Sequence, residues 1–423
     1  MSRSTAALAS QSTRTYLEEL MRLPETRIKQ AILHPEGECR ETAVRYFTDA
    51  HLQDNSVMPL VIEAIEKYGG DSSFRMLRDA ERLPQTEATV DWLVTELQRD
   101  YDRNDLAQDN HRFAVALILY RTPPTLLSRR LSDILAAPGF PDELRDPLIQ
   151  RLDMLTWDWD RGWSALKHFG VDTMRRNGFT NNDIHYARRI IDSLARHRKH
   201  HAQTVLDLLD GDIGDEPEAL MEWLLPCLAE IAGEMRLEQA VPMLLDHFVS
   251  EDLHLGDSAA SALSRIGGDS VVLAIDALWW DAEEDLRSDL ADVLRNVRGD
   301  RCVESTAAFL GAEQNRETRS ILVEALLSNF ATDAIEWGCE LVANIEEEDL
   351  DPDDLGLRYW LVAAAMIMGS KFPQFEEWHQ AALRDNWGWF ELKPGRLANG
   401  FLPDLPGPES SGNGKDYTRR SPF

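Results

Sequence analysis

Cysteine is rare in this sequence, and none of the four cysteines stands in a pair typical of a disulfide or a metal site. They are isolated from one another, and no CxxC motif is present among the 423 residues. Closely spaced cysteines are the usual mark of a disulfide framework or a zinc site. We therefore expect reduced thiols and a cytoplasmic protein.

Long apolar segments are absent as well. The longest apolar run, residues 359–369, has 11 residues, whereas a helix that crosses a bilayer needs about 20. The N-terminal residues 1–14 are rich in Ser, Thr and Ala and lack the apolar core of a secretory signal. We therefore expect no membrane attachment and no secretion.

Basic residues are few relative to acidic ones. Lys and Arg number 44 against 74 Asp and Glu, which gives a formal net charge of −30. Such a charge repels phosphate backbones and anionic lipids at long range. The composition therefore disfavours nucleic-acid binding, and acidic walls would suit an extended basic segment of a protein or peptide partner.

Motifs that mark common catalytic and cofactor sites are missing too. The sequence contains no GxSxG, no GxxxxGK[ST] and no HExxH, the patterns that place a nucleophile, a phosphate or a zinc ion. We predict a protein that is not an enzyme and that needs no cofactor and no metal.

Apolar residues recur throughout with the period of an α-helix. Leu286, Leu290, Val293, Leu294 and Val297, for example, share one helical face. Alternating strand patterns are absent over any useful length. The sequence therefore predicts an all-α protein.

A repeat in the second half refines this prediction. The segment LAEIAG at residues 228–233 recurs as LSRIGG at 263–268 and LRNVRG at 294–299, with a weaker copy at 327–332. Measured at Ile231, Ile266, Val297 and Phe330, the steps are 35, 31 and 33 residues. A period of this size is typical of stacked antiparallel helix pairs, which build an α-solenoid or superhelix. The second helix of a pair is expected at residues 240–248 and 271–280, and residues 38–47 with 57–68 predict one further pair.

The repeat resembles the HEAT-like repeats of the phycobilisome-lyase family. Residues 285–300 carry that family's acidic-x-Arg, small residue, x-Leu and Gly-Asp layout, and residues 317–327 repeat its first part. The resemblance covers roughly residues 217–345 and implies a HEAT-like α-solenoid. It also implies an alternative function, because those proteins assist the attachment of a tetrapyrrole to a cysteine. HEAT-like proteins include DNA glycosylases as well, so nucleic-acid binding is a third reading.

The division of the chain follows from these patterns. We expect a flexible N-terminus at 1–14, helical pairs at 15–103, an irregular helical region at 104–216 and HEAT-like repeats at 217–345. Capping helices follow at 346–390, and a disordered tail at 391–423.

The tail resembles a degenerate SEC-C motif, a short zinc-binding segment at the C-terminus of the SecA translocation ATPase and other bacterial proteins. Its core is retained in Gly412, Gly414, Lys415 and Tyr417. The four positions that carry zinc ligands in the family are Glu409, Ser411, Arg420 and Ser421 here. Serine hydroxyls are poor zinc ligands and arginine cannot be one, so we expect a metal-free tail.

Two groups of residues are candidates for partner binding. The first is a basic island interspersed with histidines: Arg188, Arg189, Arg196, Arg198 and Lys199. The second is a tryptophan cluster: Trp157, Trp159 and Trp163. Each group has a purely structural alternative, as the solvated face of a helix and as packing between helices, respectively.

One histidine pair within the island has the spacing of metal ligands. His197 and His201 lie at i and i+4, but Arg198 and Lys199 between them would oppose a divalent ion, and no metal is expected. The sequence as a whole predicts a non-enzymatic scaffold or adaptor that binds a partner on the curved face of the solenoid.

Overall fold

The chain is all-helical wherever the structure describes it. The computed structural model describes residues 22–69, 73–102, 105–176, 181–212, 217–249, 253–343, 345 and 352–384. Within these ranges every regular element is a helix, and extended pairing is limited to one isolated bridge between Arg22 and Ala331. The prediction of an all-α protein is confirmed, whereas the tail at 391–423 lies outside the described residues.

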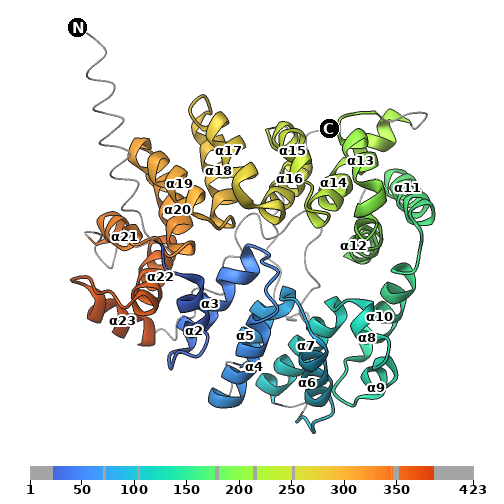
Figure 1. The fold of residues 1–423 in the computed structure, drawn as a ribbon, viewed down its shortest axis with the longest axis horizontal. Helices are drawn as coiled ribbons and strands as arrows, with labels where there is room; N and C mark the ends of the chain where they lie inside the picture. Colours follow the sequence, from blue (N-terminus) through green and yellow to red (C-terminus); the bar gives the residue numbers. More distant parts are fainter. Residues whose placement is uncertain are drawn as a thin grey trace.

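The helices form two layers around a ring (Figure 1). The inner layer is α3 (Gly37–Asp49), α5 (Ser73–Asp79), α7 (Leu106–Arg121), α10 (Asp142–Met154), α12 (Asn181–Ala195), α14 (Glu218–Glu234), α16 (Leu253–Ile266), α18 (Glu284–Arg295), α20 (Arg316–Ser328) and α22 (Pro352–Met368). Each of these helices packs against the next, and α22 packs against α3. The series therefore closes on itself.

The remaining helices lie toward the rim. They are α2 (Glu25–Ala31), α4 (Val57–Tyr68), α6 (Glu87–Leu97), α8 (Pro124–Leu127), α9 (Leu131–Ala136), α11 (Trp159–Arg176), α13 (Arg198–Leu209), α15 (Val241–Phe248), α17 (Gly268–Trp279), α19 (Asp300–Ala312), α21 (Ala334–Val342) and α23 (Phe375–Arg384). Short 3₁₀ segments, η1 (Ala80–Arg82) and η2 (Glu238–Ala240), follow α5 and precede α15. The helices predicted from the sequence at 38–47, 57–68, 240–248 and 271–280 correspond to α3, α4, α15 and α17.

Contacts between the first described residues and the region of α19 and α20 support this closure. The backbone N–H of Leu23 donates to the carbonyl of Phe330 at 3.0 Å, and Arg22 Nε lies 2.5 Å from Asp300 Oδ1. The Phe330 ring contacts Tyr46 of α3, with ring centroids 5.9 Å apart. The segment before α2 thus bridges α3 and the helices α19 and α20.

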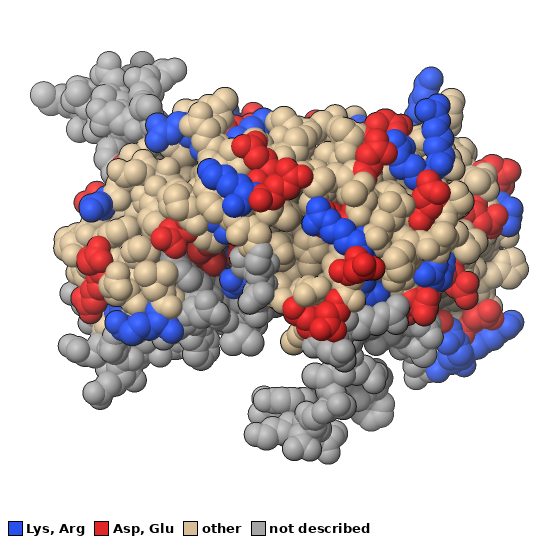
Figure 2. Space-filling view, turned by 90° about the horizontal axis from the view of Figure 1, so that it is seen from below, with Lys and Arg blue, Asp and Glu red and all other residues tan. Residues whose placement is uncertain are grey.

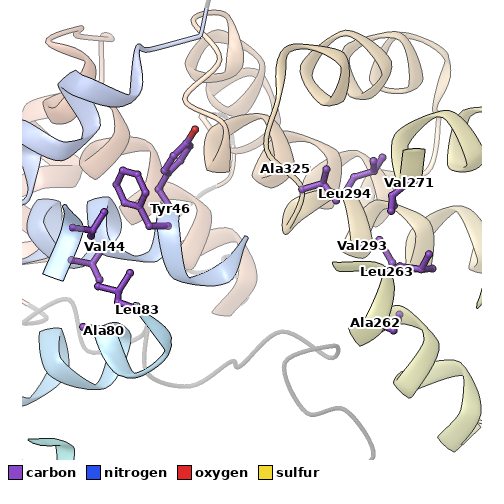
Figure 3. Close-up of a cluster of buried hydrophobic side chains, with 14 of the residues drawn as sticks. Val44, Tyr46, Ala80, Leu83, Ala262, Leu263, Val271, Val293, Leu294 and Ala325 are labelled. Carbon is purple, nitrogen blue, oxygen red and sulfur yellow. The ribbon is translucent and has the colours of Figure 1, made fainter. Parts of the chain in front are cut away.

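A continuous apolar core runs between the layers (Figure 3). Side chains of α3 and η1 form one part of it, and side chains of α16, α17, α18 and α20 form another. Among the described residues, the largest fully buried side chain is Trp279, which stacks on Phe309 with ring centroids 4.3 Å apart. Fully burying such a side chain stabilises the fold by about 1.5–3 kcal/mol.

The glycines of the repeated segment differ in their structural role. Gly267 (φ +58°) and Gly299 (φ +149°) adopt backbone conformations that favour glycine directly before α17 and α19. Gly233 lies inside the last turn of α14 instead, where an added Cβ would approach the Cα of Ala262 to 2.7 Å. Its lack of a side chain lets the backbones of α14 and α16 come close together.

An arginine near the start of an inner helix recurs around the ring. Its guanidinium group donates to carbonyl oxygens at the end of the preceding outer helix or loop, which have no partner within their own helix. This arrangement occurs at Arg40 (His34 and Pro35), Arg145 (Ala137 and Phe140), Arg287 (Ala282), Arg319 (Leu310 and Glu313) and Arg358 (Val342 and Ile345). Arg287 and Arg319 are the arginines of the acidic-x-Arg motif.

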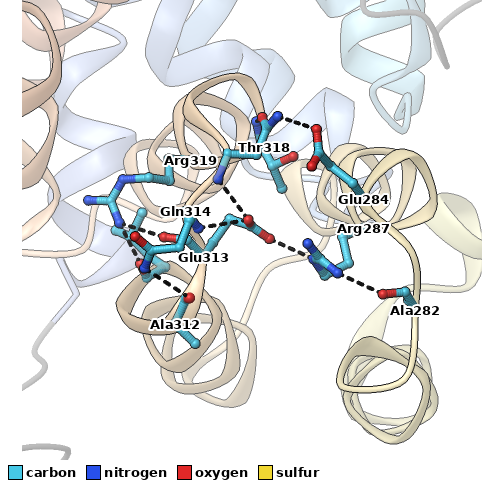
Figure 4. A network of polar contacts seen from close by, with 10 residues as sticks. Ala282, Glu284, Arg287, Ala312, Glu313, Gln314, Thr318 and Arg319 are labelled. Carbon is cyan, nitrogen blue, oxygen red and sulfur yellow. Dashed lines mark hydrogen bonds and ion pairs between the residues drawn. The ribbon is translucent and has the colours of Figure 1, made fainter.

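Glu313 shows how this contact is reinforced (Figure 4). One carboxylate oxygen accepts from Arg287 Nε at 2.7 Å, and the other accepts the backbone N–H groups of Gln314 and Asn315 at 2.7 and 2.9 Å. Asn315 in turn caps α20 by accepting from the N–H of Thr318 at 2.9 Å. The acidic and basic residues of the repeat therefore join adjacent helix pairs.

Among the residues that the structure describes, three other than glycine adopt a left-handed conformation. His51, Arg236 and Phe330 each have φ near +51°, directly after an inner helix. In each case the next residue's N–H bonds back five residues, to Phe47, Ala232 and Leu326 respectively, which is the pattern of a Schellman cap. A side chain in this conformation costs roughly 1–2 kcal/mol relative to the right-handed form. All three residues make contacts with parts of the chain that are distant in sequence.

Candidate partner-binding site

The three tryptophans of the cluster lie against two histidines of the basic island. The Trp159 ring is stacked on His201, with centroids 4.5 Å apart and planes 3° from parallel. The Trp163 ring is also nearly parallel to Trp159, with centroids 6.3 Å apart and planes at 13°. A ring nitrogen of His197 lies 3.0 Å from the carbonyl oxygen of Trp157. The start of α11 and the turn between α12 and α13 therefore form one surface, although the sequence separates them by about forty residues.

We call this surface the basic–aromatic patch and define it by nine residues: Trp157, Trp159, Arg161, Trp163, Arg196, His197, Arg198, Lys199 and His201. Trp159 is buried, while Trp157 and Trp163 are partly exposed and Arg196, Arg198 and Lys199 are exposed. Buried Trp159 thus has the packing role weighed above, and its two neighbours remain accessible.

Electrostatic contacts order the edge of the patch. The Arg161 guanidinium lies over the Trp157 ring at 4.4 Å, and the Trp157 indole N–H donates to Asp153 at 3.1 Å. Burial and the neighbouring His197 lower the pKa of His201, so its imidazole is neutral at pH 7. Exposed guanidinium and ammonium groups beside aromatic rings suit an acidic peptide segment.

The basic island is not a continuous helical ridge. Helix α12 ends at Ala195 and α13 begins at Arg198. Arg188 lies 3.8 Å from Glu234, the last residue of α14. Arg189 is buried, and its Nε has no hydrogen-bond partner among the described residues. Only Arg196, Arg198 and Lys199 of the five candidates belong to the exposed surface.

A second basic group surrounds His51 and Glu234, at the C-terminal ends of α3 and α14. We call it the interior arginine cluster and define it as Arg82, Arg121, Arg188, Arg236 and Arg265. Arg265 pairs with Glu230 and lies 3.4 Å from Glu234, Arg121 pairs with Glu81, and Arg236 donates to the carbonyl oxygen of His51. The last contact joins the ends of α14 and α3.

The charges of these arginines lower the pKa values of two neighbouring residues, His51 and Glu234. Burial lowers the pKa of His51 well below its ordinary value, and the charges of four arginines lower it further: Arg82, Arg265, Arg236 and Arg188. Burial would raise the pKa of Glu234, but Arg265, Arg188 and other arginines of the cluster hold it below its ordinary range. At neutral pH His51 is therefore uncharged and Glu234 is ionised.

The sequence did not single out most of this cluster, although one signal was present. Glu230, Arg265, Asn296 and Asn329 occupy the same position of the repeated segment. Opposite charges at equivalent positions of adjacent repeats predict the Glu230–Arg265 pair. The left-handed conformation that directs Arg236 toward His51 has no comparable signal, because residues other than glycine rarely adopt it.

The tail residues Gly412, Gly414, Lys415 and Tyr417 lie outside the described residues. Within the described ranges, no group of three or more His, Cys, Asp or Glu residues is placed to hold a metal ion. In the same part of the chain no helix is long and apolar enough to span a membrane.

Comparisons with known proteins leave the family open. No family model matches the chain, and no curated protein matches it. Among solved structures, the crystal structure of an engineered protein aligns with 83% of this chain and 100% of its own length, at 12% identity and a TM-score of 0.28. Similarity at this level carries no argument about fold or function.

Proposed function

We propose that the chain is a non-enzymatic scaffold protein whose helix pairs are HEAT-like repeats of a solenoid closed into a ring. In this proposal the basic–aromatic patch holds an acidic segment of a partner protein. The observation that carries it is the stack of Trp163, Trp159 and His201 beside three exposed basic residues.

The charge of the rest of the surface supports this choice of site. The chain has a net charge of −30, and on the face seen from below the basic side chains lie among acidic ones (Figure 2). The segment 196–201 contains Arg196, Arg198 and Lys199 without a carboxylate between them. An acidic peptide is therefore attracted here and repelled over most of the remaining surface.

The test is binding of a fluorescein-labelled Glu-rich peptide to the full chain, measured by anisotropy at increasing salt. The triple variant Arg196→Glu, Arg198→Glu and Lys199→Glu is expected to weaken binding by at least about tenfold. A matched control reverses three exposed arginines elsewhere, Arg27, Arg301 and Arg384, and changes the net charge equally. Equal loss in both variants, or no binding by the parent chain, would refute the proposal.

The same preparation tests the alternatives. A shift in the absorbance spectrum of an added bilin would favour the lyase or chromophore-handling reading. Salt-dependent retention of duplex DNA would favour nucleic-acid binding.

A further inference from the structure

A serine, a histidine and a carboxylate from three neighbouring helices form a row of polar contacts. Ser73 is the first residue of α5, Glu96 lies near the end of α6, and His111 lies in the first half of α7. Ser73 Oγ lies 2.9 Å from His111 Nδ1, and His111 Nε2 lies 3.4 Å from Glu96 Oε2. A hydroxyl nucleophile, a base and a group that orients the base therefore lie next to one another.

The carboxylate of Glu96 determines which nitrogen of the imidazole can act as a base. The side chains of Glu96 and His111 are 3% and 12% exposed, so the contact between them is shielded from water. A carboxylate beside Nε2 favours the neutral tautomer that carries its proton on this nitrogen. The lone pair of Nδ1 is then available to the Ser73 hydroxyl.

The segment after α6 holds Glu96 in this position. The Tyr101 hydroxyl donates to the backbone carbonyl of Glu96 at 2.9 Å, and the Tyr101 ring contacts His111, with ring centroids 6.3 Å apart. Arg99 Nη2 lies 2.8 Å from Glu96 Oε1, the carboxylate oxygen that is not paired with His111. Both the backbone and the side chain of Glu96 are therefore fixed by residues that follow it closely in the sequence.

A second serine–histidine pair, in α11, lacks this arrangement. Ser164 Oγ lies 3.5 Å from His168 Nδ1, but the same nitrogen lies 2.7 Å from the carbonyl oxygen of Ser164. Because a carbonyl oxygen only accepts hydrogen bonds, this nitrogen carries a proton and cannot take one from the hydroxyl. Of the two pairs, Ser73 with His111 is the one placed for proton transfer.

We propose that Ser73 is a nucleophile, activated by His111 and oriented through it by Glu96, that accepts an acyl group from an activated ester. Ser73 is partly exposed, so an ester can reach its hydroxyl. As Oγ bonds to the carbonyl carbon of the ester, the hydroxyl proton moves to Nδ1 of His111. The bond from the carbonyl carbon to the leaving oxygen then breaks, and the leaving alcohol takes the proton from Nδ1. The product is an ester of Ser73.

The charge of the chain favours an acyl donor over a phosphoryl donor. Phosphoryl donors are polyanions, which a net charge of −30 repels, whereas the reacting carbonyl group of an ester is uncharged. The reaction is a single transfer to Ser73 rather than repeated turnover, and no residue of the basic–aromatic patch takes part. Such a modification site goes beyond the scaffold function proposed above.

Incubation of the full chain with p-nitrophenyl acetate tests the inference. We expect a burst of one p-nitrophenolate per chain, with the acetyl group located on Ser73 by peptide mass spectrometry. Ser73→Ala should abolish the burst, and His111→Gln should slow it by about a hundredfold, the usual contribution of a general base. Ser164→Ala is the matched control and should leave the burst unchanged. No burst at millimolar ester, or acetyl groups on lysines or Ser164 with none on Ser73, would overturn the inference.

A cysteine variant separates activation of the nucleophile from folding. Ser73→Cys should react with iodoacetamide faster than the native cysteines, three of which are buried. Adding Glu96→Gln should slow this reaction by at least about tenfold, because the amide does not stabilise the positive charge that the imidazole acquires. Arg99→Gln, which removes the other charged partner of Glu96, should leave the rate unchanged.

The cysteine variant also shows what would contradict the role of each neighbour. An unchanged rate after Glu96→Gln would show that the carboxylate does not act through His111. If Glu96→Gln does not fold, His111→Gln in the same background decides whether the imidazole activates position 73, and an unchanged rate there would overturn the inference. Loss of acetylation with peptide binding intact would refute this inference and leave the proposed function standing, since the peptide test concerns a different surface.

Discussion

Two joints between inner helices differ in how they are stabilised. One joins helices that are close in the sequence, and the other joins helices from opposite ends of the chain. Between α14 and α16 the backbones approach closely at Gly233 and Ala262, and the buried Arg265–Glu230 pair crosses the contact. Between α3 and α22, Cys39 Sγ lies 3.9 Å from the carbonyl of Ala363, 324 positions away in sequence, and partly exposed Arg22 spans the neighbouring contact with Asp300.

The difference shows where the ring should open first. The α14–α16 joint forms between neighbouring repeats, so few residues must be ordered to bring its two sides together. The closing joint must bring together the two ends of the chain, and the entropy cost of closing a loop grows with its length. Its bridge at Arg22 lies at the surface, where water and salt screen the ion pair. The closing joint should therefore be the less stable of the two.

The largest effect on stability is expected from removing one partner of the Arg265–Glu230 ion pair, which crosses the joint between α14 and α16. Arg265→Met leaves Glu230 buried without its partner, and such a change costs about 3–5 kcal/mol. Urea unfolding monitored by circular dichroism measures it. The double variant Arg265→Met with Glu230→Gln should recover a large part of the loss. A single variant as stable as the parent chain would show that the pair does not hold the joint.

A smaller effect at the same joint concerns the close backbone approach. Gly233→Ala places a Cβ 2.7 Å from the Cα of Ala262, and such overpacking typically costs about 1–3 kcal/mol. The matched control is Gly311→Ala in α19, where the new Cβ meets no atom within 4 Å. That variant should instead gain about 0.5–1 kcal/mol, because alanine is the better helix former. A similar change in both variants would contradict the proposed role of Gly233.

At the closing joint the effect should be smaller and local. Arg22→Ala removes the contacts with Asp300, which is 81% exposed, and with the Tyr46 hydroxyl. We expect a loss of about 1 kcal/mol. Hydrogen exchange should accelerate in α2, α3 and α22 and remain unchanged in α14 and α16. Equal acceleration at both joints would mean that the ring opens as one unit.

The dependence of stability on pH compares two titratable groups of one segment, Glu41 in α3 and His51 just after it. The pKa of His51 is lower in the folded chain than its ordinary value of about 6.5. The unfolded chain therefore binds the proton more readily, and stability falls as the pH drops below about 6.5, by at most about 1.4 kcal/mol per pH unit. His51→Asn tolerates the left-handed backbone and should reduce this slope.

The pKa shift of Glu41 changes the stability with pH in the opposite direction. Burial and the nearby Glu38 raise its pKa to about 8, so the folded chain binds this proton more readily. Stability therefore falls as the pH rises from about 4.5 toward 8. Comparing the parent chain with His51→Asn at pH 7.5 and 5.5 cancels this contribution. An unchanged slope in the variant would show that His51 is not the responsible group.

The sequence was sufficient to predict the helices, but it did not predict that they form a closed ring. Apolar periodicity identified the all-α class and individual helices such as α15 and α17, because local patterns determine local structure. The contact between an arginine and the end of the preceding helix also occurs outside the repeats found in the sequence, at Arg40, Arg145 and Arg358.

The contacts around His51 and Glu234 could not be predicted from the sequence, for a different reason. The contact between Arg236 and His51 joins residues 185 positions apart, and the left-handed conformation of both is set by tertiary contacts rather than by residue type. The tryptophan cluster and the basic island were each recognised as candidates. Their union in one patch depends on the turn between α12 and α13, whose direction no local pattern specifies.

The contact between α3 and α22 also restricts how the chain can evolve. In open arrays of helix pairs each unit touches only its neighbours, so a unit can be duplicated or lost while the others keep their geometry. Here the rotations of successive pairs must add up to one full turn, or Leu23 no longer reaches Phe330. Duplicating one pair would leave the ends misaligned, and deleting one would leave a gap. The number of helix pairs is therefore fixed by geometry, and change must proceed by substitution within units rather than by altering their number.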